Sequence, residues 1–295
     1  IKKGKIRGVE SNGMLCSEEE LNIGKDSSGI MILPEDTPVG VPMKEYLGIN
    51  DTVFELEITP NRPDCLSHIG IARELGAYYN KEVKYPSFAI NSESSEKTAD
   101  NISVEIENSN LAKRYVARII KNVTVKESPK WLKERVESIG IRSINNIVDA
   151  SNFIMMELNQ PNHTFDLDKI EGGKIVVRAG HENEKLVTLD EQERELNSDD
   201  IVISDGVKAV ALGGVMGGQN SEITENTKNI LLEVANFNSQ NVRKTSRRLT
   251  LFSESSYRFE RRVDEENAIN VINRLANIIQ EVAGGEILEG VVDNY

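Results

Sequence analysis

The feature that most constrains the fold is a series of short strand-like segments from residue 103 onward. They are Ser103–Ile106, Arg114–Lys121, Lys174–Arg178, Ile201–Ser204, Ala209–Leu212 and Ile230–Val234. One clear helix follows them, in which apolar residues recur at three- and four-residue steps until Gly284-Gly285 stops it: Ala268, Val271, Ile272, Leu275, Ile278, Ile279 and Val282. Many strands with a few helices predict a multidomain fold of the α+β class with a mixed sheet.

Further elements are expected on either side of residue 103. Ser67–Tyr79 is predicted to be a helix with Ser67 as its N-cap, and Pro129–Ile139 a helix that ends at Gly140. Strands are predicted at Gly29–Pro34 and Val53–Ile58, and the second alternates apolar and polar residues with period two. An apolar-rich segment, Ile144–Leu158, is left without an assignment.

The length of 295 residues fits about two domains. The stretch 89–102 is polar, has three serines near Asn91–Glu96, and is the best candidate for a linker. A further domain is therefore expected to begin near residue 103. Residues 1–22 contain short β-like pieces, and the chain begins with Ile1 rather than Met. We therefore expect a piece of a longer protein that starts within a small β module.

Charge and cysteine content exclude some classes of protein. A formal net charge of −13 argues against wholesale coating of nucleic acid, although a local basic surface remains possible. The run Arg243–Arg262 holds seven Lys/Arg against two glutamates, and it is either a binding surface or a solvated face with ordinary ion pairs. Cys16 and Cys65 lie far apart without metal-ligand spacing, so we expect no disulfide, no metal site and a cytoplasmic location. Apolar runs are far shorter than the roughly 20 residues that cross a bilayer.

His163 is the first candidate for chemistry. It lies in Asn159–Asp166, a stretch of Asn, Gln and Pro that predicts irregular backbone, where binding groups concentrate. A histidine there could orient a water molecule or a substrate group at neutral pH. The alternative is a surface-loop histidine bonded to its own backbone. His68 and His181 are expected to be structural or surface residues.

Two other features point to a pocket. Leu212–Gly218 contains two glycine pairs, which either let backbone approach a ligand or form a tight packing corner. It is not a phosphate loop, because the Lys-Ser/Thr that should follow is absent. Glu233 lies in the strand-like run Ile230–Ala235; a carboxylate buried on both faces needs a partner or a purpose, whereas one on a wet face is ordinary.

Taken together, the motifs are far more specific than any one of them. They run in order through the chain as Glu57–Cys65, Gly70–Glu74, Gly140–Ile144, Val148–Phe153, Glu157–Pro161 with His163 and Phe165-Asp166, Gly213–Gly218, Leu232-Glu233 and Ser256–Arg261. In this sequence and order they resemble the beta subunit of bacterial-type phenylalanyl-tRNA synthetases. The resemblance covers essentially the whole chain.

The resemblance implies a domain organisation and partners. Residues 1–22 would be the end of an OB-type tRNA-binding module, 23–88 a small α+β domain, 89–102 a linker and 103–292 an editing domain that hydrolyses tyrosine mischarged onto the phenylalanine tRNA. The family also implies a catalytic alpha subunit in an assembly of two alpha and two beta chains, the phenylalanine tRNA as a partner, and ATP and Mg²⁺ for the full enzyme. It implies no cofactor in this fragment.

The family's editing site carries over by motif position. His163, Asn152 and Ser151 would be catalytic, Glu233, Pro161, Gly213 and Gly214 would bind the substrate, and the basic run suggests tRNA contacts at Arg243, Lys244, Arg247 and Arg248. Ser151 replaces the usual Thr and keeps its hydroxyl. Arg262 replaces a usual Gly, which puts a glycine-dependent turn there in doubt.

Two other functions remain open from the sequence. One is a scaffold or tRNA-docking piece with a degenerate pocket, and the other is an unrelated small-molecule hydrolase. Editing is favoured because Asn152, His163 and Glu233 are intact. A second site of this kind is useful because a hydrophobic synthetic pocket rejects an added hydroxyl by only about 100-fold, whereas a site built to bond that hydroxyl discriminates by roughly 10⁴–10⁵. An ionised Glu233 can accept the phenol O–H.

Overall fold

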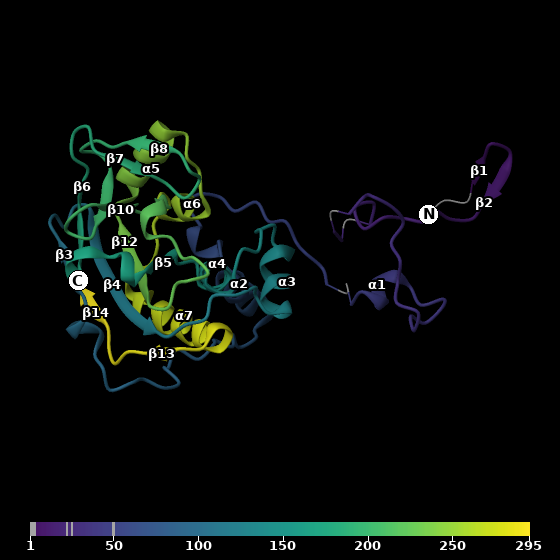
Figure 1. The fold of residues 1–295 in the computed structure, drawn as a ribbon, viewed down its shortest axis with the longest axis horizontal. Helices are drawn as coiled ribbons and strands as arrows, with labels where there is room; N and C mark the ends of the chain where they lie inside the picture. Colours follow the sequence, from purple (N-terminus) through teal and green to yellow (C-terminus); the bar gives the residue numbers. More distant parts are fainter. Residues whose placement is uncertain (1–3, 22, 25, 49–50) are drawn as a thin grey trace. The chain divides into compact units, whose positions relative to one another are not determined.

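The computed structural model describes residues 4–21, 23–24, 26–48 and 51–295. The chain divides into two compact units, Ile1–Phe54 and Glu55–Tyr295, and each is described by itself. The first unit holds an antiparallel hairpin of β1 (Gly4–Ile6) and β2 (Val9–Ser11) and a four-residue helix, α1 (Met43–Tyr46) (Figure 1). The strand predicted at Gly29–Pro34 is wrong, because Ile30 and Ile32 stay exposed and no strand of the described residues pairs with this segment.

The second unit is built on two sheets of five strands each. The first sheet has the order β13-β4-β12-β5, with β14 also paired to β4, and all its pairs are antiparallel. Its strands are β4 (Ala112–Lys121), β5 (Asn162–Asp166), β12 (Ile230–Phe237), β13 (Glu286–Ile287) and β14 (Val292–Asn294). Every residue of the central β12 is buried, which fits a strand covered on both faces.

The second sheet is mixed and has the order β11-β10-β9-β6-β3. Its strands are β3 (Ser103–Ile106), β6 (Lys174–Ala179), β9 (Ile201–Ser204), β10 (Ala209–Leu212) and β11 (Met216–Gly217). Only β3 and β6 run parallel. A separate hairpin joins β7 (Lys185–Val187) to β8 (Glu193–Glu195). These sheets and the helices around them confirm the predicted α+β class.

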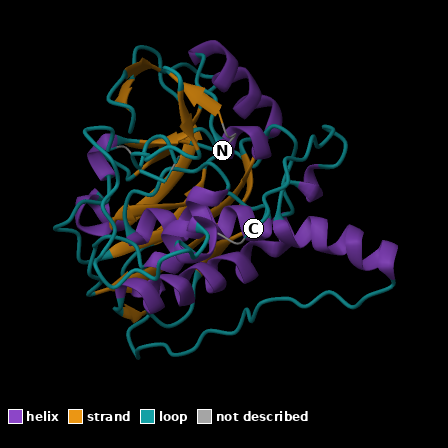
Figure 2. Ribbon diagram, turned by 90° about the vertical axis from the view of Figure 1, so that its right-hand side faces the viewer, coloured by secondary structure: helices purple, strands orange, loops and turns teal. Residues whose placement is uncertain are grey.

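Alternation along the central strands creates two cores. On β12, Ile230, Leu232 and Val234 pack with the helices, while Leu231 and Ala235 belong to the core shared with the second sheet. Three helices cover the face of the first sheet that carries Ile230, Leu232 and Val234. They are α3 (Lys130–Ser138), α4 (Asn146–Leu158) and α7 (Ala268–Ala283), and helices are purple in Figure 2. Glu233 therefore points, with Leu231 and Ala235, toward the second sheet.

Most predicted elements are confirmed. The strands at 103–106, 201–204 and 209–212 have the predicted bounds, and α2 (His68–Tyr79) begins after Ser67, whose side chain accepts a hydrogen bond from the Gly70 N–H. The long helix ends at Gly284 as predicted. The strand predicted at Val53–Ile58 is wrong. Its residues adopt no strand and pair with no strand in the described ranges, and Phe54 is 78% exposed.

The division after residue 54 differs from the boundaries expected from the sequence. Helix α2 packs on α4, and His68 Nδ1 lies 3.0 Å from the carbonyl oxygen of Met156. The polar stretch 89–102 lies along β4 and β13, where Glu93 pairs with Arg118 at 2.7 Å and the Ser94 N–H donates to the Ile287 carbonyl. Its polar side chains suggested a linker, but several of them are partners of charged residues on β4.

Candidate active site

A small cavity lies between the two sheets, beneath the helix α6 (Glu254–Phe259). Its volume is about 50 Å³, which is space for a few water molecules. Residues of β5, β9, β10, β11, β12 and α6, and of the segments next to β5 and between β10 and β11, line the cavity: Pro161, Asn162, His163, Ile203, Ala211, Leu212, Gly214, Val215, Met216, Gly217, Glu233, Ser255 and Phe259. Most of the lining residues are apolar, but polar atoms form much of the cavity surface, so Asn162, His163, Glu233 and Ser255 decide which ligands fit.

Glu233 is the carboxylate of the cavity, and only 5% of the residue is exposed. The Tyr115 hydroxyl donates a hydrogen bond to Glu233 Oε2 at 2.7 Å. Burial raises the pKa of Glu233 to about 7, and the bond from Tyr115 opposes that rise by favouring the ionised form. Among the described residues no other side chain bonds to this carboxylate. Its second oxygen is therefore available to a ligand.

His163 lies in strand β5, directly opposite Glu233 in the antiparallel register, so both side chains point to the same face. The prediction of irregular backbone at this position is wrong, because β5 pairs with β12 along its whole length. The ring packs edge-to-face on Phe165, with 4.5 Å between the ring centroids. Burial of the ring lowers the pKa of His163 to about 4, so the imidazole is neutral at physiological pH and is a weak base.

The glycines around the cavity are required for different reasons. A Cβ on Gly217 would lie 2.6 Å from Cε1 of His163, so the imidazole occupies the space of the missing side chain. Gly214 has φ +73°, and a Cβ there would lie 2.8 Å from the Val242 side chain. Gly213 does not line the cavity; it packs against Ile201, which a Cβ would approach to 2.7 Å.

Ser151 and Asn152 lie on α4, outside the cavity wall. The Ser151 hydroxyl donates to Asn162 Oδ1 at 2.7 Å, and the Asn162 amide donates back to the Ser151 carbonyl at 3.1 Å. Asn162 itself lines the cavity, so Ser151 reaches the site through it. Asn152 is half-buried and is not among the lining residues.

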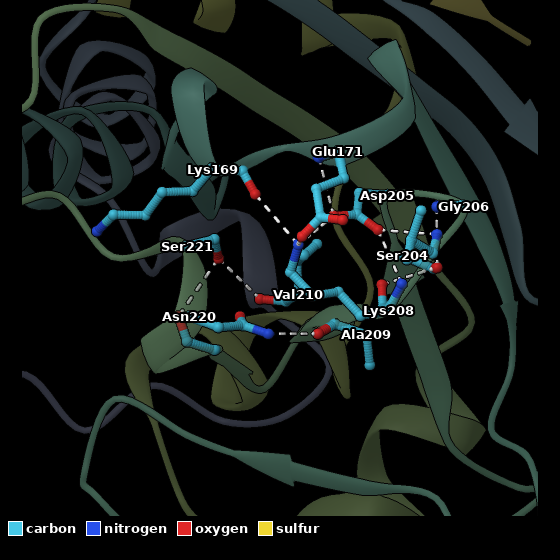
Figure 3. A network of polar contacts seen from close by, with 12 residues as sticks. Lys169, Glu171, Ser204, Asp205, Gly206, Lys208, Ala209, Val210, Asn220 and Ser221 are labelled. Atoms are coloured by element: carbon cyan, nitrogen blue, oxygen red, sulfur yellow. Dashed lines mark hydrogen bonds and ion pairs between the residues drawn. The ribbon is translucent and has the colours of Figure 1, made fainter.

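The turn between β9 and β10, two strands that supply residues to the cavity wall, is held by a network of polar contacts (Figure 3). Lys208 Nζ lies 2.8 Å from Asp205 Oδ2 and 2.5 Å from Glu171 Oε1. Asn220 donates to the Ala209 carbonyl and Ser221 to the Val210 carbonyl, both on β10. These bonds fix the strand that supplies Ala211 and Leu212 to the cavity wall.

Comparison with known proteins decides the family. Residues 111–284 match the B3/4 domain. The chain belongs to this family. The matched range contains every residue that lines the cavity, so the cavity is a feature of the B3/4 domain itself.

The whole chain is also similar to part of longer proteins named phenylalanine–tRNA ligase beta subunit. The one from Fusobacterium nucleatum is 56% identical and the one from Geobacter metallireducens 50% identical, in each case over 100% of this chain and 37% of the relative. The resemblance predicted from the motifs is thus confirmed. A solved N-terminal fragment of the phenylalanyl-tRNA synthetase beta-subunit from Pyrococcus horikoshii matches at TM-score 0.46 and 14% identity, over 86% of this chain and 74% of that one.

The basic run on the B3/4 domain is partly structural. Helix α5 (Ser239–Leu249) carries four exposed basic residues, of which Lys244 pairs with Asp199 at 3.2 Å and Arg248 pairs with the buried Asp200. Within the described part of the chain, the side chains of the other two, Arg243 and Arg247, make no ion pair or hydrogen bond.

The end of the same run is structural as well. Arg258 is buried, and it bonds to Glu254 and to the Leu66 carbonyl. Arg261 lies over the Tyr257 ring at 3.6 Å. Arg262 has φ +73°, so the left-handed turn is present without a glycine.

Residues that sequence reasoning missed include Tyr115, Ser255 and Phe259 of the cavity region. Ser255 and Phe259 lie in or beside the quoted Ser256–Arg261 motif, but nothing in that motif indicates a pocket. Among the described residues one group, Asp64, Cys65 and Glu74, is close enough to hold a metal ion, and Arg62 already pairs with both carboxylates. No helix in the described ranges is long and apolar enough to span a membrane.

Proposed function

We propose that the chain is part of the beta subunit of a phenylalanine–tRNA ligase and that its B3/4 domain hydrolyses tyrosyl-tRNA(Phe). The observation that carries the proposal is Glu233, a buried carboxylate that lines the cavity and has one oxygen free of bonds to the described residues. Similarity to the named relatives along the full chain supports the assignment.

The discrimination follows from the second oxygen of Glu233. The cavity of about 50 Å³ has to widen to admit a tyrosine ring, whose para-hydroxyl can then donate to that oxygen. A hydrogen bond to a charged group is worth about 1.5–3 kcal/mol. Phenylalanine leaves the carboxylate desolvated and without that donor. Burial raises the pKa of Glu233 to about 7 because it destabilises the ionised carboxylate. A ligand that donates a hydrogen bond to the carboxylate stabilises that ionised form, and a ligand without a donor does not.

Hydrolysis requires little more than positioning. An aminoacyl ester already has an activated leaving group, so placing a water molecule and stabilising the oxyanion suffice. A neutral imidazole at His163 can orient that water through either ring nitrogen, but with a pKa of about 4 it is a poor general base. The terminal adenosine of the tRNA is a further candidate to assist. Ser151 would act as a positioning residue, through its hydrogen bond to Asn162, and the catalytic role that the family implies for Asn152 stays a prediction.

Contacts to tRNA are proposed for the basic residues of α5, Arg243, Lys244, Arg247 and Arg248. Arg243 and Arg247 are the stronger candidates, because Lys244 and Arg248 already have acidic partners. We further propose residues 1–22 as the end of an OB-type module, 23–88 as a small α+β domain, and 103–292 as the editing domain.

The full enzyme is proposed to require the catalytic alpha subunit, in two alpha and two beta chains, together with ATP and Mg²⁺. Aminoacylation belongs to the part of the enzyme outside this chain. Two free cysteines, Cys16 and Cys65, are consistent with the cytoplasm as its location.

The test is deacylation of tyrosyl-tRNA(Phe) and phenylalanyl-tRNA(Phe) by this chain, beside Glu233→Ala and His163→Ala. We expect rapid loss of tyrosine only, with both variants strongly impaired. If the wild type releases neither amino acid, the assay is repeated with the full alpha and beta assembly. Inactivity there as well would leave a scaffold with a degenerate pocket, and equal cleavage of a free tyrosyl ester would indicate a small-molecule hydrolase.

A further inference from the structure

Tyr115 is a fully buried polar residue that the proposed hydrolysis does not use. It lies on β4 at 0% exposure, and its ring belongs to the core between the two sheets. Its hydroxyl has one hydrogen-bond partner among the described residues, Glu233 Oε2 at 2.7 Å. A phenylalanine would fill the same space without a polar atom to satisfy, so the hydroxyl serves the carboxylate and not the packing.

The strand register explains how the two side chains meet. Tyr115 is opposite Ala235 on β12, and Glu233 is opposite Ala117 on β4. The two residues are therefore diagonal neighbours on one face of the sheet, a spacing that long side chains bridge. Both lie on strands in the middle of the first sheet, so the carboxylate is anchored to rigid backbone.

This contact determines what Glu233 can do. Tyr115 takes one carboxylate oxygen and leaves the other toward the cavity. As a donor it favours the ionised carboxylate, which can only accept a hydrogen bond from a ligand. His163, from β5, is the other titratable group that faces Glu233; the cavity residues from β9, β10, β11 and α6 carry no charge.

We propose that Tyr115 is a positioning and specificity-determining residue, which fixes Glu233 as a hydrogen-bond acceptor for the para-hydroxyl of the substrate. One carboxylate is then flanked by two phenols, a resident one from β4 and an incoming one from the mischarged amino acid. The inference rests on the proposed function, because the second phenol is the tyrosine of that substrate.

The first test is Tyr115→Phe in the chain, with deacylation of tyrosyl-tRNA(Phe) and phenylalanyl-tRNA(Phe) measured from about pH 6 to about pH 9. Loss of a donor to a charged group predicts a fall of roughly 10-fold or more in kcat/KM for the tyrosyl substrate at neutral pH. The rise of activity with pH should move upward by about one pH unit, so that part of the loss is recovered at high pH. Tyr295→Phe is the matched control, because Tyr295 donates to Glu266 at 2.6 Å on the surface.

The second test follows the Glu233 carboxyl directly by ¹³C NMR, with Glu233→Gln to assign its signal. We expect a higher titration midpoint in Tyr115→Phe than in the wild type. An unchanged midpoint, or a loss of activity equal at every pH, overturns the role of Tyr115 and leaves it a packing residue. A third outcome is possible: Tyr115→Phe raises the midpoint, but the wild type hydrolyses no tyrosyl-tRNA, either as this chain or in the full assembly. That outcome would overturn the proposed function and, with it, the specificity part of the inference.

Discussion

Replacing Glu233 by glutamine should stabilise the second unit by an amount that grows with pH. Burial raises the pKa of Glu233 from 4.5 to about 7. A carboxyl whose pKa is raised in the folded state contributes stability that is complete below 4.5 and is lost as the pH rises through about 7. The difference of about 2.5 corresponds to about 3 kcal/mol, at about 1.4 kcal/mol for each pKa step. The wild type lacks that stability at pH 8, and the variant keeps it.

His163 has the opposite dependence. Burial lowers its pKa from 6.5 to about 4, so its contribution is complete above 6.5 and is lost as the pH falls toward 4. The two effects are similar in size, and they offset each other in the wild type between about 4.5 and 6.5. In Glu233→Gln only the His163 effect remains, so the free energy of unfolding should rise with pH through this window. In His163→Gln only the Glu233 effect remains, so the free energy of unfolding should fall.

Urea unfolding at several pH values, followed by tryptophan fluorescence, measures these slopes. Trp131 is the single tryptophan, and it packs edge-on to Phe153 at 5.8 Å in the second unit. Glutamine retains an oxygen that accepts from Tyr115, so the variant should fold. Glu225→Gln, on an exposed residue, is the control for charge alone. A difference between Glu233→Gln and the wild type that stays constant from about pH 5 to about pH 8 would refute the burial argument.

Three further predictions follow from the glycine wall, the turn at Arg262 and the basic helix. Gly217→Ala should displace the His163 ring and lower the deacylation rate by roughly 100-fold, with the fold intact by circular dichroism. Gly29→Ala, whose Cβ meets nothing within 4 Å, is the control and should have no effect. Full activity in Gly217→Ala would contradict the placement of the ring. Arg262→Gly should raise the urea stability by roughly 0.5 kcal/mol, because relief of the left-handed backbone exceeds the added chain entropy, and a clear loss would show that the arginine side chain holds the turn. Arg243→Glu with Arg247→Glu should weaken tRNA binding and flatten its salt dependence, measured by filter binding beside Lys185→Glu, and an unchanged salt slope would remove α5 from the interface.

Local patterns predicted the elements that are stabilised by their own periodicity. The helix Ala268–Ala283 and the strands of the second sheet follow from apolar spacing and glycine positions. Gly29–Pro34 and Val53–Ile58 carry equally good strand patterns but pair with no strand in the part of the chain that the structure describes. A strand needs a neighbour to satisfy its backbone groups, and the sequence of the segment alone does not reveal whether one is available.

The sequence named some of the residues around the cavity and missed others, because contacts between distant strands cannot be read from one segment. His163, Glu233, Pro161 and Gly214 lie around one cavity, as the family resemblance implied. Asn152 lies outside the wall, and Ser151 acts through Asn162. Tyr115 could not be found, because an apolar strand with one tyrosine is typical of any core. Its meaning comes from the β4–β12 register, which brings it diagonally across from Glu233.

The central claim is that Glu233 recognises the para-hydroxyl of the amino acid by accepting a hydrogen bond from it. The most direct measurement is the ratio of deacylation rates at pH 8 for tRNA(Phe) charged with tyrosine and with 4-fluorophenylalanine, which is similar in size but has no donor. The wild type, as this chain or in its assembly, should prefer tyrosine by roughly 10-fold or more, and Glu233→Ala should bring the ratio close to one. Equal rates in the wild type, or a preference that survives Glu233→Ala, would contradict the account.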